Sequence, residues 1–224
     1  METPTYTGHE ESWRGAGIAC TARADLMTNA IDPGCTSILC RPNNPGGRRN
    51  TLTELKEYAA LIEQRRGTLI IDASFADFET TSHAALLENP AVIMFRSFGK
   101  TYGLAGLRLG FALGRHSVMS RLATALGPWP VHELALHIGT SALEDAAWRL
   151  KIADKLTVHA EKLRVMMSRA GFSFVGGTPL FSLFSHPRAR HFWRYCAAQG
   201  VATRRFRDRP EWLRLGRPRR RGHV

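Results

Sequence analysis

Residues 96–110, RSFGKTYGLAGLRLG, place a lysine between small residues and an arginine eight positions later. Lys100 could serve either of two kinds of chemistry. Its ammonium group could hold a phosphate by charge, as the lysine of a nucleotide-binding P-loop does, or its amine could bond covalently to a carbonyl cofactor. The glycines around it help to decide between these uses.

The nucleotide-binding patterns both fail here. A P-loop needs a glycine five residues before Gly99, so that backbone amides can wrap the phosphate, but that position is Met94, inside a predicted strand. The dinucleotide pattern G-x-G-x-x-G also fails, because Gly103 and Gly106 have no partner at the required spacing. The sequence therefore disfavours a nucleotide site at Lys100.

Asn44, Asp72 and Lys100 each stand at, or shortly after, the end of a predicted strand. Ligands of open α/β sheets bind at the carboxyl ends of the strands, so we expect these side chains to gather there. Pyridoxal phosphate needs a lysine to bond covalently, a carboxylate that keeps the ring nitrogen protonated, and a donor to the ring oxygen. The three residues are of these types.

The elements that must position them can be predicted from the apolar pattern. Short β-rich runs, with helical stretches between some of them, predict an α/β fold with a mostly parallel sheet covered on both faces. The last two runs are joined by a loop without room for a helix, so one irregular connection is expected. The runs are residues 36–41, 68–72, 91–95 and 107–113.

The clearest helix is predicted over residues 52–66. Thr51 and Glu54 fit a capping box at its start, and Gly67 stands at its C-terminal cap position. Four apolar residues spaced for one helix face complete the pattern.

The character of the chain changes after Pro130. Residues 131–169 predict long helical material, broken near residues 139–140. A strand at 178–184, a helix at 187–200 and the short WLRLG run then predict a smaller α+β lobe.

Three motifs, in this order, resemble the signature of the fold-type I, pyridoxal-phosphate-dependent aminotransferases of class I/II. Further segments are similar to the branch that holds histidinol-phosphate aminotransferases and, most closely, the threonine-phosphate decarboxylases of cobalamin biosynthesis. The resemblance covers residues 4–216. The motifs are RPNNPGG (41–47), IIDASFADF (70–78) and RSFGKTYGLAGLRLG (96–110), and the further segments are GPWPV (127–131), GGTPLFSLF (176–184) and WLRLG (212–216).

The resemblance implies a role for each matching residue. Lys100 corresponds to the lysine that bonds the cofactor and Asp72 to the partner of the pyridine nitrogen. Asn44 corresponds to the donor to the ring oxygen, and an arginine is expected to grip the substrate carboxylate, since its planar fork suits bidentate binding. The other carried-over residues are Ser97 and Arg108 for the phosphate, Tyr6 stacked on the ring, and Arg214 for that carboxylate.

The implied architecture is an α/β large domain of the pyridoxal-phosphate transferases, present in part, followed by a smaller C-terminal lobe. We expect the partial cofactor-binding domain at 1–130 and a long connecting helix at 131–170. The lobe is expected at 171–216 and a disordered basic tail at 217–224.

The implied activity is decarboxylation of L-threonine O-3-phosphate, with histidinol-phosphate-type transamination as the alternative. Many aminotransferases carry a tyrosine three residues after the ring-nitrogen carboxylate, but here that residue is Phe75. The loss of the hydroxyl favours decarboxylation. The expected partners are a small phosphorylated amino acid and, if the chain is intact, a second subunit.

Family chains start well before the PTY motif, with a glycine-rich turn whose amides cradle the cofactor phosphate. This sequence has no such turn upstream of Tyr6, and an arginine string follows Gly216. We therefore expect a truncated reading frame. A catalytically inert fragment is a rival interpretation.

The net charge of +12 raises nucleic-acid binding as another rival, but residues 204–224 alone contribute +7 of it, nine arginines against Asp208 and Glu211. The charge is thus a tail feature and does not favour nucleic-acid binding as the main function. Steep salt dependence of binding would support that rival.

Cys20, Cys35, Cys40 and Cys196 form no CxxC pair, and residues 1–15 are polar and acidic. Reduced thiols, no secretory signal and no apolar run of roughly eighteen residues predict a cytoplasmic protein that does not span a membrane. No metal site is predicted, because His132 and His137 are five residues apart, off the i,i+4 spacing of a helical metal pair.

Overall fold

The structure is a computed structural model that describes residues 1–28, 30–79 and 82–216. The chain divides into two compact units. The first consists of Met1–Asn44 and Arg48–Asp145, and the second of Pro45–Gly47 and the residues from Ala146 onward. The predicted basic tail, 217–224, lies outside the described residues.

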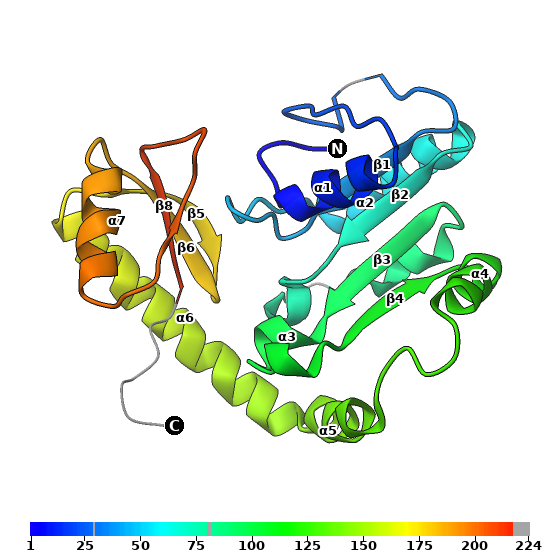
Figure 1. The fold of residues 1–224 in the computed structure, drawn as a ribbon. Coiled ribbons are helices and arrows are strands. Elements are labelled where there is room, and N and C mark those ends of the chain that lie inside the picture. Colours follow the sequence, from blue (N-terminus) through cyan, green and yellow to red (C-terminus); the bar gives the residue numbers. More distant parts are fainter. Residues whose placement is uncertain (29, 80–81, 217–224) are drawn as a thin grey trace. The chain divides into compact units, whose positions relative to one another are not determined.

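The described residues of the first unit form four strands with helices between them (Figure 1). Its α-helices and strands are α1 (Thr7–Gly15), β1 (Thr36–Cys40), α2 (Leu52–Gln64), β2 (Thr68–Asp72), β3 (Val92–Ser97), α3 (Phe98–Thr101), β4 (Gly110–Gly114), α4 (His116–Leu126) and α5 (Glu133–Glu144). Three short 3₁₀ helices are η1 (Ala76–Phe78), η2 (Ala84–Glu88) and η3 (Ala105–Leu107).

The sheet of this unit has the order β1-β2-β3-β4. The first three strands run parallel, and β4 pairs antiparallel with β3. The mostly parallel sheet predicted from the sequence is therefore confirmed. The antiparallel direction of β4 was not itself predicted; only an irregular connection before this strand was expected. The register sets Cys40 opposite Asp72 and Asp72 opposite Phe95, so three carboxyl ends meet at one edge.

Helix α2 packs on the sheet through Leu55 and Ile62, which are fully buried in the same cluster as the strand residues Leu39 and Ile71. Its capping box is present, since Glu54 N–H donates to the Thr51 hydroxyl and the Thr51 N–H donates to the Glu54 carboxylate. The helix ends at Gln64, two residues earlier than predicted.

The connection between β3 and β4 differs from the prediction. It does hold a helix, the four-residue α3, followed by η3. Strand β4 begins at Gly110 and not at residue 107, because Leu107 still belongs to η3 and Arg108 takes a left-handed conformation with φ of 53°.

The predicted helix break near Gly139 is wrong. Gly139 is buried within α5, where a Cβ atom would lie 2.5 Å from Leu109 Cδ2. The glycine therefore permits close packing and does not end the helix. The break falls instead at Asp145, which follows α5.

The second unit is an antiparallel sheet packed with two helices, which confirms the predicted α+β lobe. Both helices share an apolar cluster with the sheet that includes Met167, Phe184 and Leu213. The strand order is β5-β6-β8-β7. The elements are α6 (Ala146–Arg169), β5 (Ser173–Thr178), β6 (Phe181–Ser185), α7 (Ala189–Ala198), β7 (Arg204–Arg205) and β8 (Trp212–Gly216).

The single strand predicted at 178–184 is a hairpin. Thr178 ends β5 and Phe181 begins β6, with Pro179 and Leu180 between them. The Leu180 N–H donates to the Thr178 hydroxyl at 3.1 Å, which closes the turn.

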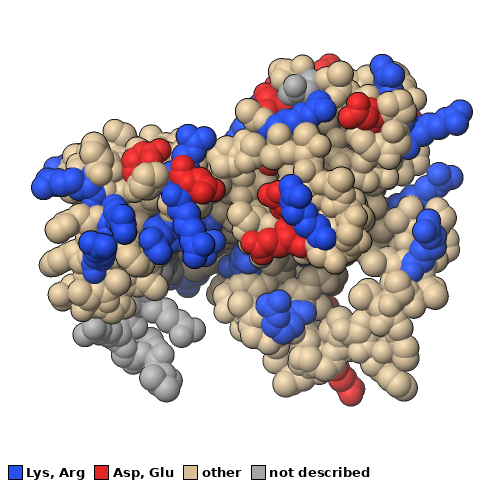
Figure 2. Space-filling model, turned by 45° about the horizontal axis from the view of Figure 1, so that its top comes forward, with Lys and Arg blue, Asp and Glu red and all other residues tan. Residues whose placement is uncertain are grey.

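No helix among the described residues is long and apolar enough to cross a membrane. On the face drawn in Figure 2, separate Lys and Arg side chains are interspersed with Asp and Glu.

Candidate active site

Asp72 lies buried at the end of β2, at the centre of a hydrogen-bonded group. Its Oδ2 atom lies 2.9 Å from His9 Nε2 and 3.4 Å from the Cys40 thiol, which donates to it. The Ser74 N–H donates to Oδ1 at 3.0 Å. Cys40 ends β1 beside Asp72, and His9 comes from the first turn of α1.

These contacts set the charge of the group. Burial by itself would raise the pKa of Asp72, but the hydrogen bonds from His9 and Ser74 outweigh it, so that pKa lies below its ordinary value. Burial, and then the nearby Asp72 charge, raises the pKa of the Cys40 thiol to about 12. At neutral pH the site therefore holds an ionised carboxylate and a protonated thiol.

His9 and Cys40 were not among the site residues predicted from the sequence. Cys40 ends its strand, as Asp72 does, so the strand-end argument could have found it. His9 lies 63 residues from Asp72 in the chain, and no local pattern links the two. It is brought there by the N-terminal segment, which the buried ion pair of Glu2 and Arg41 holds to the end of β1.

His9, Cys40 and Asp72 also have the ligand types of a metal centre, with their ligand atoms within 4.8 Å of one another. Hydrogen bonds already account for this arrangement, and the thiol would have to lose its proton to bind a metal. His132, considered in the sequence for metal binding, instead caps α5 by accepting from the Ala135 N–H at 3.1 Å.

Lys100 lies in α3, directly after β3, and is exposed. Its Nζ atom is 5.9 Å from the centroid of the Phe75 ring. Buried Phe98 anchors the short helix and stacks on Tyr102 at 4.4 Å. Gly99 allows close packing, because a Cβ there would lie 2.7 Å from Ala105 Cα.

Ser97 and Arg108 lie at the same end of the β3–β4 pair, since Ser97 is opposite Gly110 in the register. Ser97 is the N-cap residue of α3, but its side chain makes no capping hydrogen bond. Arg108 is exposed and donates to the Ala105 carbonyl at 3.2 Å.

Tyr6 and Asn44 lie next to this edge of the sheet. Tyr6 precedes α1, is 51% exposed, and meets the His9 ring edge-on with centroids 5.5 Å apart. Asn44 follows β1 and is half-buried. Its neighbour Asn43 donates to the Pro4 carbonyl at 2.9 Å and accepts from the Thr5 hydroxyl at 2.8 Å, which fixes the segment before Tyr6.

Arg214 belongs to the second unit, in β8. Its guanidinium carbon lies 5.0 Å from the centroid of the Phe181 ring, and burial, together with nearby Arg204, lowers its pKa. Six of the seven predicted residues thus lie in the first unit, and Arg214 lies in the second.

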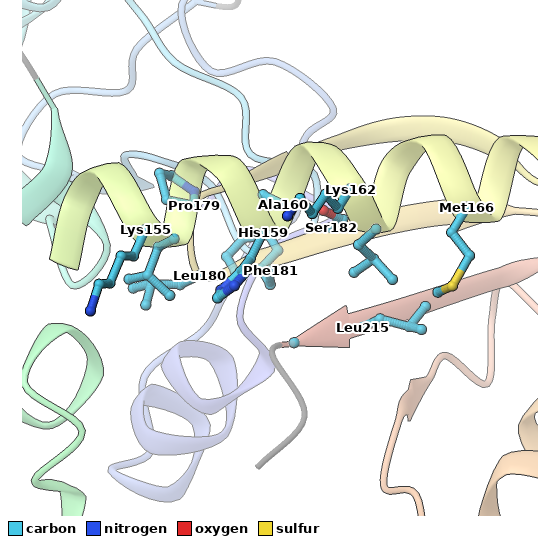
Figure 3. A pocket seen from close by; sticks show the side chains of 13 residues that line it. Lys155, His159, Ala160, Lys162, Met166, Pro179, Leu180, Phe181, Ser182 and Leu215 are labelled. Carbon is cyan, nitrogen blue, oxygen red and sulfur yellow. The ribbon is translucent and has the colours of Figure 1, made fainter. Parts of the chain in front are cut away.

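The second unit also contains a pocket of about 680 Å³ between α6, β6 and β8 (Figure 3). Leu156, Leu163, Phe181 and Leu215 give it an apolar wall, with lysines such as Lys155 beside it. No predicted site residue is among the described residues that line it.

The group in the first unit fits the chemistry of pyridoxal phosphate. An ionised, buried carboxylate suits a protonated ring nitrogen, and an exposed lysine amine is free of ion pairs among the described residues. A hydroxyl and a guanidinium at one end of the β3–β4 pair suit a phosphate.

Comparisons of the sequence with known proteins find one family and its members. The chain matches the family "Aminotransferase class I and II" over residues 1–218. It is 36% identical over 221 residues to a threonine-phosphate decarboxylase of Pseudomonas aeruginosa, covering 96% of this chain and 66% of that protein. It is 36% identical over 217 residues to one of Sinorhizobium, covering 95% and 64%. The chain therefore spans about two thirds of the length of these relatives.

The fold is also similar to solved structures of such enzymes. The crystal structure of L-threonine-O-3-phosphate decarboxylase from Porphyromonas gingivalis aligns with a TM-score of 0.83 at 21% identity, over 98% of this chain and 71% of that one. The histidinol-phosphate aminotransferase of Clostridium acetobutylicum aligns with the same score at 17% identity, over 96% and 71%. At these identities the matches bear on the fold alone.

Proposed function

This chain belongs to the aminotransferase class I and II family, and we propose that it is a pyridoxal-phosphate-dependent enzyme that decarboxylates threonine phosphate. One observation carries the proposal. The ionised Asp72, held by His9 and Cys40, stands at a strand end beside the strand that leads to Lys100. Such a charge, placed where ligands of α/β sheets bind, is what the cofactor requires.

When bound, pyridoxal phosphate accepts into its ring the electrons of a bond broken at the substrate Cα. Asp72 would keep the proton on the ring nitrogen, and Asn44 would donate to the ring oxygen. The Lys100 amine would hold the cofactor covalently and then move protons at Cα. The remaining roles are phosphate binding by Ser97 and Arg108, ring packing by Tyr6, and binding of the substrate carboxylate by Arg214.

Two observations support decarboxylation. The chain is 36% identical to the two decarboxylases over nearly its whole length. In addition, a phenyl ring and not a phenol lies near Lys100, because residue 75 is phenylalanine. Which bond at Cα breaks would be decided by the side chains that orient the substrate.

Histidinol-phosphate transamination is the second candidate. A histidinol-phosphate aminotransferase of Symbiobacterium thermophilum is 35% identical over 155 residues, or 67% of this chain and 42% of that protein. The same residues would serve, with Lys100 removing the Cα proton instead. A catalytically inert chain is the third outcome to test.

The test is borohydride reduction of the purified chain with pyridoxal phosphate, followed by peptide mapping. We expect stoichiometric label on Lys100, lost in Lys100→Ala and kept in the control Lys56→Ala, which changes an exposed lysine of α2. Scattered label or none would overturn the proposal and favour an inert chain. Release of carbon dioxide from threonine phosphate, against amino-group transfer from histidinol phosphate, then separates the two activities.

A further inference from the structure

We propose that Asp77 is a positioning residue for Lys100. Its carboxylate ties η1, which follows the Asp72 strand, to the segment of β3 and α3 that carries Ser97 and Lys100. This inference rests on the proposed function, because it concerns the placement of the lysine that would bond the cofactor.

Both oxygens of Asp77 are used. Oδ1 accepts a hydrogen bond from the Arg96 guanidinium, and Oδ2 accepts one from the Thr101 hydroxyl. Arg96 comes directly before Ser97, and Thr101 directly after Lys100. One carboxylate therefore holds the segment 96–101, which carries Ser97 and Lys100, at both of its ends.

The surroundings make these bonds stronger than an ordinary surface contact. The Thr101 residue is only 4% exposed, and the side chains of Asp77 and Arg96 are 13% and 32% exposed. A charged hydrogen bond shielded from water in this way is roughly twice as strong as a neutral one.

Helix α3 needs such an anchor. It has four residues, and a single turn is not stable by itself, because nucleating a helix costs more than its first hydrogen bond returns. Lys100 is exposed, and its Nζ atom lies over the Phe75 ring, 5.9 Å from the centroid. The backbone on either side must therefore place its amine.

Asp77 also lies close in the chain to the other half of the site. It is five residues after Asp72, and the Ala76 N–H donates to the Ala73 carbonyl at 3.0 Å, which fixes the start of η1. The hydrogen bonds of Asp77 thus link two segments. One contains Asp72, which would bind the ring nitrogen, and the other contains Lys100, which would bond the aldehyde. A misplacement of about 1 Å in such a pair can cost on the order of a hundredfold in rate.

The test compares Asp77→Asn and Thr101→Val with two controls. Thr101→Ser keeps the hydroxyl, and Glu79→Gln removes a neighbouring carboxylate whose ion pair, at 2.9 Å, is with Arg49 and not with α3. In the cofactor-free protein we expect faster amide exchange over residues 97–102 in Asp77→Asn and Thr101→Val, with unchanged exchange in α2. Both controls should match the unchanged chain.

With cofactor, condensation of the Lys100 amine with the pyridoxal phosphate aldehyde releases water, and borohydride then traps the bond. We expect the trapping rate at Lys100 to fall roughly tenfold in Asp77→Asn, because the amine is misplaced. Affinity for pyridoxine 5′-phosphate, which has no aldehyde to bond, should stay within about twofold, since a positioning residue acts on bond formation more than on binding.

The inference is overturned if Asp77→Asn traps at the normal rate, or if trapping and pyridoxine phosphate affinity fall together in step with its melting temperature. It is also overturned if Glu79→Gln has the same effect. If the unchanged chain fails to label Lys100, the proposed function fails and the role toward the cofactor fails with it. The exchange data would then still report, separately, whether Asp77 holds α3.

Discussion

The carboxylate of Asp72 keeps its charge although it is buried, because its neighbours donate hydrogen bonds to it. His9 is the largest of these contributions, since its hydrogen bond is the first of the effects that lower the pKa against burial. In His9→Phe the burial stays and the donor is lost, so we expect the pKa of Asp72 to rise. The ¹³Cγ shift of Asp72, followed against pH by NMR, measures it, with His137→Phe, an exposed histidine, as the control.

The lowered pKa of Asp72 also determines how the stability of the fold depends on pH. A carboxyl whose folded pKa lies below its unfolded value of about 3.9 stabilises the fold above that pH, and the contribution is lost as pH falls through the folded pKa. Acid unfolding below about pH 4 should therefore depend less on pH in His9→Phe. An unchanged Asp72 titration in this variant would show that His9 does not hold the charge.

Cys40 offers a second measurement on a single side chain. Its pKa of about 12 and its burial leave almost no thiolate at pH 8, whereas Cys20 and Cys35 are half-buried. We expect N-ethylmaleimide to modify Cys20 and Cys35 in the folded chain at pH 8 and to spare Cys40. All should react in urea. Labelling of Cys40 as fast as Cys35 in the folded protein would contradict its place in the Asp72 group.

For single residues, the sequence predicts which side chains belong to the site better than it predicts which side chains they contact. Asp72 and Cys40 reach one edge because parallel strands end together, which a strand prediction implies. His9 arrives through the N-terminal segment, whose path depends on the buried Glu2–Arg41 pair and on Asn43. Such long-range polar contacts have no periodic signal, so only the folded structure reveals them.

Among the elements, α2 shows how closely local chemistry can be predicted. Its capping box is formed as expected, and hydrogen bonds from Thr51 hold the pKa of Glu54 below its usual range. Thr51→Ala should lower the free energy of unfolding by about 1 kcal/mol, the ordinary cost of an N-cap. Urea denaturation measures it, and Thr51→Ser, which keeps the hydroxyl, should lie close to the unchanged chain. An equal loss in both would point to a cause other than the cap.

Strand β5, in contrast, could not be predicted from its local sequence. Its sequence contains Gly176 and Gly177, a pair that usually marks a turn, and the sequence analysis predicted no strand there. The glycines are needed because other backbone comes close. A Cβ on Gly177 would lie 2.4 Å from the Phe181 carbonyl oxygen, and one on Gly176 would lie 2.0 Å from that of Gly46. A tertiary contact therefore overrides the local signal.

At the scale of the whole chain, the residues proposed to bind the cofactor belong to one unit and Arg214 to the other. Six of the seven predicted residues are in the first unit, in its strands or in the segments that adjoin them. Arg214 lies in the antiparallel sheet of the second unit, stacked on Phe181. We therefore expect added cofactor to slow hydrogen exchange in the first unit, and added substrate to slow it in the second unit as well.

Hydrogen exchange read by mass spectrometry can follow both steps, because a bound ligand slows the opening of the segments that it contacts. Pyridoxal phosphate alone should protect peptides around residues 4–9, 40–44, 72–78 and 96–108 and leave β8 unchanged. Threonine phosphate added to the loaded chain should then slow exchange around Arg214. In Arg214→Lys the first step should persist and the second should weaken, since lysine lacks the planar fork that grips a carboxylate. Protection that appears first in β8, or in the pocket between α6 and β6, would show that the cofactor binds elsewhere.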